Sequence, residues 1–363
     1  MVPLGTGPDD STRDSDTDGT AAQVTTTLSD LDRPDPDEVD VKARPISRRS
    51  TGADAVFAHG ARAVGASVLV ITGGVGVFLG YQAIPTFERY GLGFFTTTEW
   101  SPDTDTIGIA AVLVGTFQVA LVAMVIAFPL ALATALYISE DAPARLKATL
   151  VSMVDLMAAV PSIIYGLFIY LLIMPYAADL SIWFDRNLGW LPIFKVPGGQ
   201  ADSPLPALSQ YGFSAFVAGI AVSMMVMPMA CAVMRQVFSQ TPPGEKEAAL
   251  ALGASTWGMV RTVVLPFGRG GIIGGTMLAM GRALGETIAV ALILSPSFEI
   301  KGSLTEKGGS TISSLIANRF GDASSSQLSA LLAAGLVLFL ITLLFNTLAA
   351  IVVNRSRSGA ETD

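Results

Sequence analysis

Six long apolar segments between residues 62 and 353 constrain this chain more than any other feature of its sequence. Each is long enough for a helix to cross the hydrocarbon layer of a bilayer, which takes about 20 residues. Because backbone groups in lipid must find hydrogen-bond partners within the protein, the segments are expected to be helices. The sequence therefore predicts an all-α integral membrane protein with six transmembrane helices. The segments run approximately over 62–84, 107–138, 148–176, 212–238, 268–295 and 327–353.

Glycine and proline positions predict how these helices pack and bend. Small residues four apart allow two helix backbones to approach closely, and prolines inside a helix mark kinks. The expected kinks are at Pro129, Pro161 and Pro228. The glycine pairs are Gly76 and Gly80, Gly270 and Gly274, Gly271 and Gly275, and Gly281 and Gly285.

The composition agrees with a membrane setting and excludes several classes of function. Apolar residues make up 51% of the chain and charged residues 14%, whereas a soluble domain carries about 25% charged residues. A single cysteine, Cys231, and a single histidine, His59, exclude a disulfide framework and a clustered metal site. No stretch matches the phosphate-cradling pattern G-x-x-x-x-G-K-[ST]. We therefore expect no enzyme activity in this chain, no cofactor, no metal and no nucleic-acid partner.

The net charge of −8 comes from the N-terminal tail, because residues 1–40 hold eleven Asp or Glu against two Arg. Such a segment, without aromatic residues, cannot bury enough apolar surface to offset its ordering entropy. We expect residues 1–55 to be a disordered acidic tail and residues 60–355 to be the membrane domain. Lysine and arginine near the predicted helix ends number thirteen on one side and six on the other. The positive-inside rule then places both termini in the cytoplasm.

Two charged residues, Arg282 and Glu286, lie inside the fifth apolar segment. An arginine at mid-membrane costs about 3–10 kcal/mol, so it persists only when it faces a cavity or a partner. In a continuous helix the two residues, four apart, would share one face. They are either a self-neutralising pair or an anion site on the translocation path. Asp155, in the third segment, either faces the same path or pairs with a base near the cytoplasmic side.

If the pair is an anion site, one hypothesis is that it suits phosphate. The arginine fork fits two phosphate oxygens, and phosphate near neutral pH still carries a proton that Glu286 can accept. Sulfate carries none and would leave that carboxylate unpaired and repelled.

The loop between the fourth and fifth segments, residues 241–268, predicts a helix, a glycine turn and a second helix. Thr241 is the expected N-cap, with Pro242 in the first helical position. Gly253 ends this helix. The second begins near Ser255 or Thr256 and stops before Leu265 and Pro266. The unit is either a docking site for a cytoplasmic partner or an amphipathic helix lying at the membrane surface.

This loop resembles the EAA signature of permease subunits of type I binding-protein-dependent ABC importers. That pattern is Glu-Ala-Ala, three residues, Gly, nine residues, then Ile, one residue and Leu-Pro; here Val263 replaces the isoleucine. The resemblance implies that the loop docks onto a separate ATPase subunit and passes its motion to the membrane helices. The implied coupling contacts are Glu247, Ala248, Ala249 and Gly253.

Four further stretches narrow the resemblance to phosphate-specific importers, and within them to the C-type permease subunits. They are residues 115–140, 160–168, 281–290 and 314–321. The resemblance implies a permease for inorganic phosphate in a prokaryotic plasma membrane, with Arg282 and Glu286 associated with transport. It also implies a sister permease, an ATPase dimer and an extracytoplasmic phosphate-binding protein as partners.

Two alternatives stay open from the sequence. A sulfate or molybdate permease would share the same architecture. An ion-coupled secondary transporter would use the membrane charges without an ATPase, although no evident inverted repeat supports it.

Overall fold

The computed structural model describes residues 52–203 and 207–357. Residues 1–51, which make up nearly all of the predicted acidic tail, lie outside the described residues. The chain divides into two units, residues 1–64 and 65–363. The first unit contributes the start of helix α1, and the arrangement described below is that of the second.

The described residues are mostly helical, with one antiparallel pair of two-residue strands. The elements are α1 (Gly52–Tyr90), α2 (Gly93–Thr96), β1 (Trp100–Ser101), β2 (Thr106–Ile107), α3 (Ala110–Leu136), α4 (Ala144–Ala159), α5 (Ser162–Phe168), α6 (Met174–Leu188), α7 (Ala215–Phe238), α8 (Pro243–Ala251), α9 (Thr256–Met259), α10 (Leu265–Phe267), α11 (Arg269–Leu284), α12 (Ile288–Ile293), α13 (Ile312–Arg319) and α14 (Ser325–Arg357). Segments of π-helix continue or join some of these helices, namely Tyr137–Asp141 after α3, Ile169–Ile173 between α5 and α6, and Val260–Val264 between α9 and α10.

By length and composition, five helical segments of the described residues can cross a membrane, or six if one bent pair counts as a single span. The bent pair joins Thr256–Phe267 to Arg269–Leu284 at an angle of 68°. The five are Asp54–Tyr90, Ala110–Asp141, Ser162–Leu188, Ala215–Phe238 and Ser325–Val353. The all-α membrane fold predicted from the sequence is confirmed, and the expected segments differ from the structure mainly at the third and the fifth.

The third predicted span, 148–176, is not one helix. Helix α4 ends at Ala159, and Val160 is extended, with ψ of 130°. The cause is Pro161, because its ring disfavours the helical conformation of the residue before it. The candidate span here begins after the proline and runs over Ser162–Leu188. By contrast, Pro129 and Pro228 lie inside the continuous helices α3 and α7.

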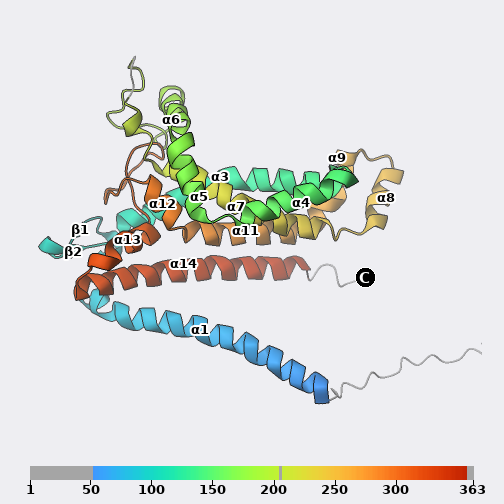
Figure 1. The fold of residues 1–363 in the computed structure, drawn as a ribbon, viewed down its shortest axis with the longest axis horizontal. Coiled ribbons are helices and arrows are strands. Elements are labelled where there is room, and N and C mark those ends of the chain that lie inside the picture. Colours follow the sequence, from blue (N-terminus) through green and yellow to red (C-terminus); the bar gives the residue numbers. More distant parts are fainter. Residues whose placement is uncertain (1–51, 204–206, 358–363) are drawn as a thin grey trace, which may run out of the picture. The chain divides into compact units, whose positions relative to one another are not determined.

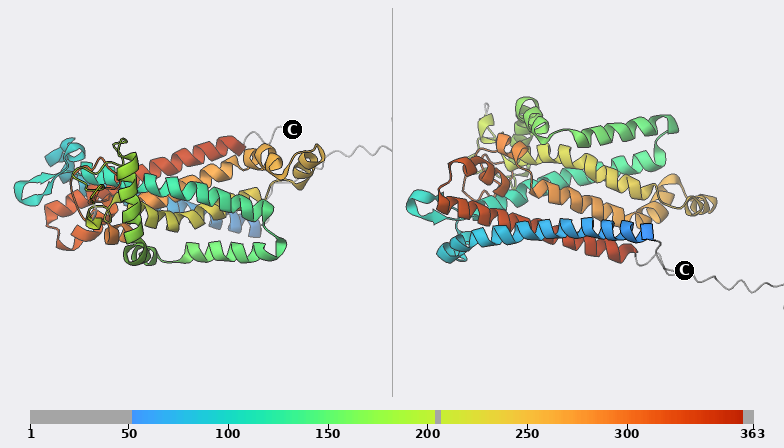
Figure 2. Two further views of the ribbon diagram at one scale, coloured as in Figure 1. Left: turned by 90° about the horizontal axis from the view of Figure 1, so that it is seen from above. Right: turned by 60° about the horizontal axis from the view of Figure 1, so that its bottom comes forward.

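Helix α7 is the centre of the second unit. It packs against α3, α11, α4, α5, α6 and α12, and α3, α7 and α11 run side by side in Figure 2. Fully buried small residues lie on α3 and α7 within this group of helices, including Ala120 and Ala127 of α3 and Ala218 and Ala230 of α7. Because small side chains bring the backbones close, van der Waals contact here substitutes for the hydrophobic drive that lipid does not supply.

Glycines make the closest approaches in this core. A Cβ at Gly219 of α7 would collide with the side chain of Val122 on α3. On α11, a Cβ at Gly271 would lie 2.5 Å from the Cβ of Val237, and one at Gly275 would lie 3.0 Å from the Ala230 carbonyl oxygen. The predicted packing role of the Gly271 and Gly275 pair is therefore confirmed.

The glycine pair expected on α1 is only half right. A Cβ at Gly76 would lie 3.0 Å from the Phe339 ring of α14, whereas Gly80 has open space around it. Helix α1 is instead joined to α14 by hydroxyl contacts, since Ser329 Oγ lies 2.8 Å from Thr86 Oγ1 and donates to the Gln82 carbonyl at 2.7 Å.

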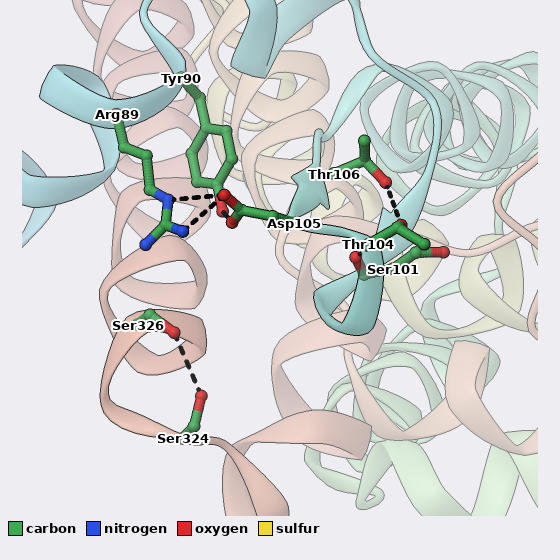
Figure 3. A network of polar contacts seen from close by, with 8 residues as sticks. All are labelled: Arg89, Tyr90, Ser101, Thr104, Asp105, Thr106, Ser324 and Ser326. Carbon is green, nitrogen blue, oxygen red and sulfur yellow. Dashed lines mark hydrogen bonds and ion pairs between the residues drawn. The ribbon is translucent and has the colours of Figure 1, made fainter.

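A polar contact fixes the end of α1 to the β1–β2 hairpin (Figure 3). Arg89 pairs with Asp105 at 2.5 Å, and the Tyr90 hydroxyl donates to the other carboxylate oxygen at 2.7 Å. The hydrogen bonds from Arg89 and Tyr90 hold the pKa of Asp105 below its ordinary value. Asp105 has φ of 56°, a left-handed conformation that aspartate tolerates better than most residues. This contact lies at the opposite end of the bundle from α8 and α9 (Figure 1).

The close contact of α7 with α3 gives a first prediction. We expect Gly219→Ala to destabilise the protein by about 1–3 kcal/mol, because the added methyl group overpacks against Val122. The measurement is the apparent Tm of the detergent-solubilised protein. Gly80→Ala is the matched control, since its methyl group enters open space and a glycine inside a helix costs about 0.5–1 kcal/mol relative to alanine. Equal melting temperatures for the two variants would contradict the packing role of Gly219.

Candidate functional site

The fifth predicted span, 268–295, is interrupted where its charges lie. Helix α11 ends at Leu284, the backbone N–H of Glu286 donates to the Ala283 carbonyl at 3.3 Å, and α12 begins only at Ile288. Arg282 is in the last turn of α11, while Glu286 lies in the non-helical break. The expectation that both residues share one face of a continuous helix was therefore wrong.

The Glu286 side chain explains how the chain restarts after this break. Its Oε1 accepts the backbone N–H of Ala289, three residues later, at 3.3 Å. A carboxylate in this position satisfies one of the N–H groups that the first turn of a helix leaves without a partner. Glycine at 285 adds to the effect, because glycine weakens a helix interior. A local side-chain bond thus competes successfully with continuation of α11.

Glu286 and Arg282 have different environments. Glu286 is 7% exposed, and Arg282 is exposed. No ion pair within 4.0 Å joins them in the described part of the chain. The structure thus gives no support to the self-neutralising pair that the spacing allowed. It leaves a buried carboxylate one turn beyond an exposed guanidinium.

Helix α12, which Glu286 caps, is held against α5 by a close approach. A Cβ at Gly166 of α5 would lie 2.9 Å from the Cα of Ala289, and α12 also packs against α7 and α13. The sequence contained Gly166 but nothing that indicated which helix it would meet. This contact fixes the position of the break, and with it the Glu286 carboxylate.

Asp155 pairs with a base, as one of its two interpretations required. Its Oδ1 lies 3.5 Å from Nη2 of Arg235 on α7, and Arg235 Nε is buried without a hydrogen-bond partner. The pair connects α4 to α7, so Asp155 is accounted for by helix packing.

The loop between α7 and α11 forms the predicted helix, turn and helix, with shifted boundaries. Pro242 is the N-cap and Pro243 occupies the first turn of α8, whereas Thr241 is buried and its hydroxyl has no partner. The predicted cap at Thr241 was wrong because Pro243 keeps the residue before it out of the helical conformation. Pro242 accordingly has ψ of 128°.

The turn and the start of the second helix agree with the sequence prediction more closely. Gly253 has φ of +88°, as a left-handed turn requires. The Ser255 hydroxyl accepts the Gly258 backbone N–H at 3.1 Å and caps α9. The helix does not stop before Leu265, because the π-helical turn carries the chain through Pro266 to the bend at Gly268.

The exposed side of this helix–turn–helix carries both charged and large apolar side chains. Glu247, Ala248 and Gly253 are exposed, and Ala249 is half-buried against the main core. Beside them, three large apolar side chains are also exposed, namely Leu250 at 46%, Leu252 at 90% and Trp257 at 64%. Exposed apolar clusters mark contact surfaces. The sequence pattern predicts contacts at the first four positions, whereas Leu250, Leu252 and Trp257 carry no motif that singles them out.

Comparison with known proteins assigns the class of this chain. Residues 127–358 match the family of binding-protein-dependent transport system inner membrane components. The chain belongs to this family of multi-pass membrane permeases. It is similar over 82% of its length to a solved bacterial alginate ABC transporter in complex with an alginate pentasaccharide-bound periplasmic protein, at 14% identity and a TM-score of 0.54, with 93% of that chain covered. This likeness confirms the ABC importer permease fold.

Closer relatives are phosphate permeases. The chain is 35% identical over 325 residues to the phosphate transport system permease protein PstC 2 of Mycobacterium tuberculosis, with 88% of this chain and 97% of that protein covered. It is 38% identical over 264 residues to PstC of Xylella fastidiosa, with 72% and 78% covered. The resemblance to C-type phosphate permeases is thereby confirmed.

The left-handed turn gives a second prediction. Gly253→Ala places a Cβ in a conformation that costs about 1–2 kcal/mol, so we expect faster hydrogen exchange of the α8 amides. Gly244→Ala, inside α8 with open space around it, is the control and should slow exchange, because alanine favours the helix. Hydrogen exchange with mass spectrometry on peptides spanning α8 makes the comparison. Equal protection in both variants would exclude a role for the turn in ordering α8.

Proposed function

We propose that this chain is a membrane permease subunit of an ATP-driven importer of inorganic phosphate. The observation that carries this proposal is its similarity to PstC proteins over almost their whole length. Such similarity extends through the helix–turn–helix and the break in the fifth span. No phosphate-cradling loop is present in the sequence, so ATP hydrolysis belongs to a separate subunit.

In this proposal, α8 and its turn are the contact with the ATPase. The contact surface with the ATPase includes Leu252 and Trp257, which supply apolar side chains. It also includes the four motif positions Glu247, Ala248, Ala249 and Gly253. The exposure of these side chains supports the assignment. A dimer of ATPase subunits, a sister permease and an extracytoplasmic phosphate-binding protein complete the importer. Both termini, and the α8 end of the bundle, then face the cytoplasm, in agreement with the thirteen basic residues on that side.

Arg282 and Glu286 are the proposed contacts with phosphate during translocation. The exposed guanidinium can donate two hydrogen bonds to one anion. Glu286, buried and bonded to a single backbone N–H, can accept the remaining proton of hydrogen phosphate. Since a buried carboxylate is costly unless it is paired, a protonated anion that reaches it is favoured over one without a proton.

Labelled phosphate uptake tests this function directly. The permease and its partner subunits are supplied to cells that lack their own phosphate importers, with excess sulfate and molybdate as competitors. We expect uptake that neither competitor reduces. Strong competition by sulfate would overturn the substrate assignment, and absence of phosphate uptake would overturn the proposal.

The role of Arg282 gives a third prediction. We expect Arg282→Gln to reduce uptake by about tenfold or more, because a hydrogen bond to a charged group contributes about 1.5–3 kcal/mol. Arg269→Gln, at the other end of α11 and also exposed, is the matched control and should retain uptake. An Arg282→Gln protein that transports as the control does would remove this residue from the path.

Glu286 gives a fourth prediction, on selectivity. In Glu286→Gln the amide no longer repels an anion without a proton and can donate a hydrogen bond to it. We expect the ratio of phosphate uptake with excess sulfate to uptake without sulfate to fall, even where total uptake also falls. Competition curves for the variant and the parent protein supply the measurement. An unchanged ratio would show that Glu286 only caps α12.

A further inference from the structure

A shielded ion pair joins α8 to the end of a membrane-spanning helix. Lys246 Nζ donates to both carboxylate oxygens of Glu140, at 2.8 and 2.9 Å, across 106 residues of sequence. The Glu140 side chain is 6% exposed and that of Lys246 is 21% exposed. Partial burial weakens screening by solvent, so the attraction between the two charges is screened less than in a surface ion pair.

The remaining attachments of α8 are weak. No residue of α8 is buried, and its main neighbours are α9 and the π-helical turn that directly follow it. Among the described residues, Lys246 supplies the side-chain hydrogen bonds that link α8 to a membrane-spanning helix. The half-buried Ala249 adds an apolar contact with the core. Beyond its contacts with α9 and the π-helical turn, α8 is therefore attached to the bundle through this charged contact and Ala249.

Glu140 lies where a displacement can be passed on. It belongs to the π-helical turn Tyr137–Asp141, which continues α3 without interruption. Lys147 of α4 donates to the Ser139 carbonyl in the same turn at 3.0 Å. The turn thus joins three helices, and α3 itself is packed along α7 and α11. A movement of this turn has to move α3 or break its contacts.

We propose that the Lys246–Glu140 ion pair is the link that carries motion of α8 to helix α3, so that Lys246 and Glu140 are positioning residues for transport. This inference rests on the proposed function, in which α8 follows the ATPase. The pair makes α8 and the end of α3 move together. Without the pair, α8 can follow the ATPase while α3 stays behind.

The first test is the ratio of phosphate imported to ATP hydrolysed by the reconstituted complete importer in vesicles. For Lys246→Met and for Glu140→Gln we expect this ratio to fall about tenfold, as for the loss of a hydrogen bond between charged groups, while ATP hydrolysis continues. The exchanged protein, with Lys246→Glu and Glu140→Lys together, should recover part of the ratio. Lys246→Arg, which keeps the charge, should retain it.

A matched control comes from the other end of the bundle. Lys301 Nζ donates to Glu299 and Glu306, both at 2.8 Å, and its side chain is 20% exposed. Lys301→Met therefore removes a similar double contact far from α8, and we expect the transport ratio to be unchanged. If Lys246→Met and Lys301→Met lower the ratio equally, or if neither does, the link is overturned.

A distance measurement separates this inference from the proposed substrate. Spin labels at Leu252, which is 90% exposed, and at Leu130 of α3, which is 52% exposed, report on α8 and α3 in the assembled complex. We expect the distance to stay constant between nucleotide-free and ATP-trapped complexes, and to change in Lys246→Met. A change of the same size with and without the pair would overturn the inference. Absence of phosphate uptake by the parent protein would instead overturn the proposed function and leave this distance test valid.

Discussion

Close backbone contact between α3 and α7 is the interaction on which the rest of this structure depends. Lipid supplies no hydrophobic drive between helices, so the bundle relies on packing of small residues. Gly219 against Val122, and Gly271 and Gly275 against α7, bring three helices into one tightly packed group. Around this group, α4, α5 and α12 attach through contacts that include the Asp155–Arg235 pair and the Gly166–Ala289 approach.

The predicted spans are interrupted before Pro161 and between α11 and α12, and these breaks show how the helix bundle tolerates irregular backbone. Unpaired backbone groups are too costly in lipid, so breaks are found where protein provides partners. After α11, the Ala283 carbonyl accepts from Glu286, whose carboxylate accepts from Ala289. The buried Glu286 carboxylate serves the local structure through its bond from the Ala289 N–H. In our proposal, the same carboxylate starts α12 and contacts phosphate.

The helix–turn–helix between α7 and α11 combines two opposite requirements. In our proposal its outer side has to be exposed to meet the ATPase subunit, which leaves little surface for attachment to the bundle. The Lys246–Glu140 pair attaches α8 to the bundle with a small contact area, because a charged hydrogen-bonded contact is strong for its size. It is also directional, since it connects α8 to one helix, α3, and through the adjacent turn to α4.

Sequence alone determined the class of fold, the number of long apolar segments to within one, the glycine turn at Gly253 and the resemblance to phosphate permeases. These properties depend on local composition, on short spacings or on motifs. It failed where two local preferences competed: Pro243 moved the helix start away from Thr241, Pro161 ended the third predicted span early, and Glu286 restarted the chain after α11. Only the tertiary structure decided that Glu286 is buried apart from Arg282, and that Lys246 meets Glu140. Such contacts join residues far apart in the chain or rotate a helix toward its neighbours, and neither effect leaves a periodic signal in the sequence.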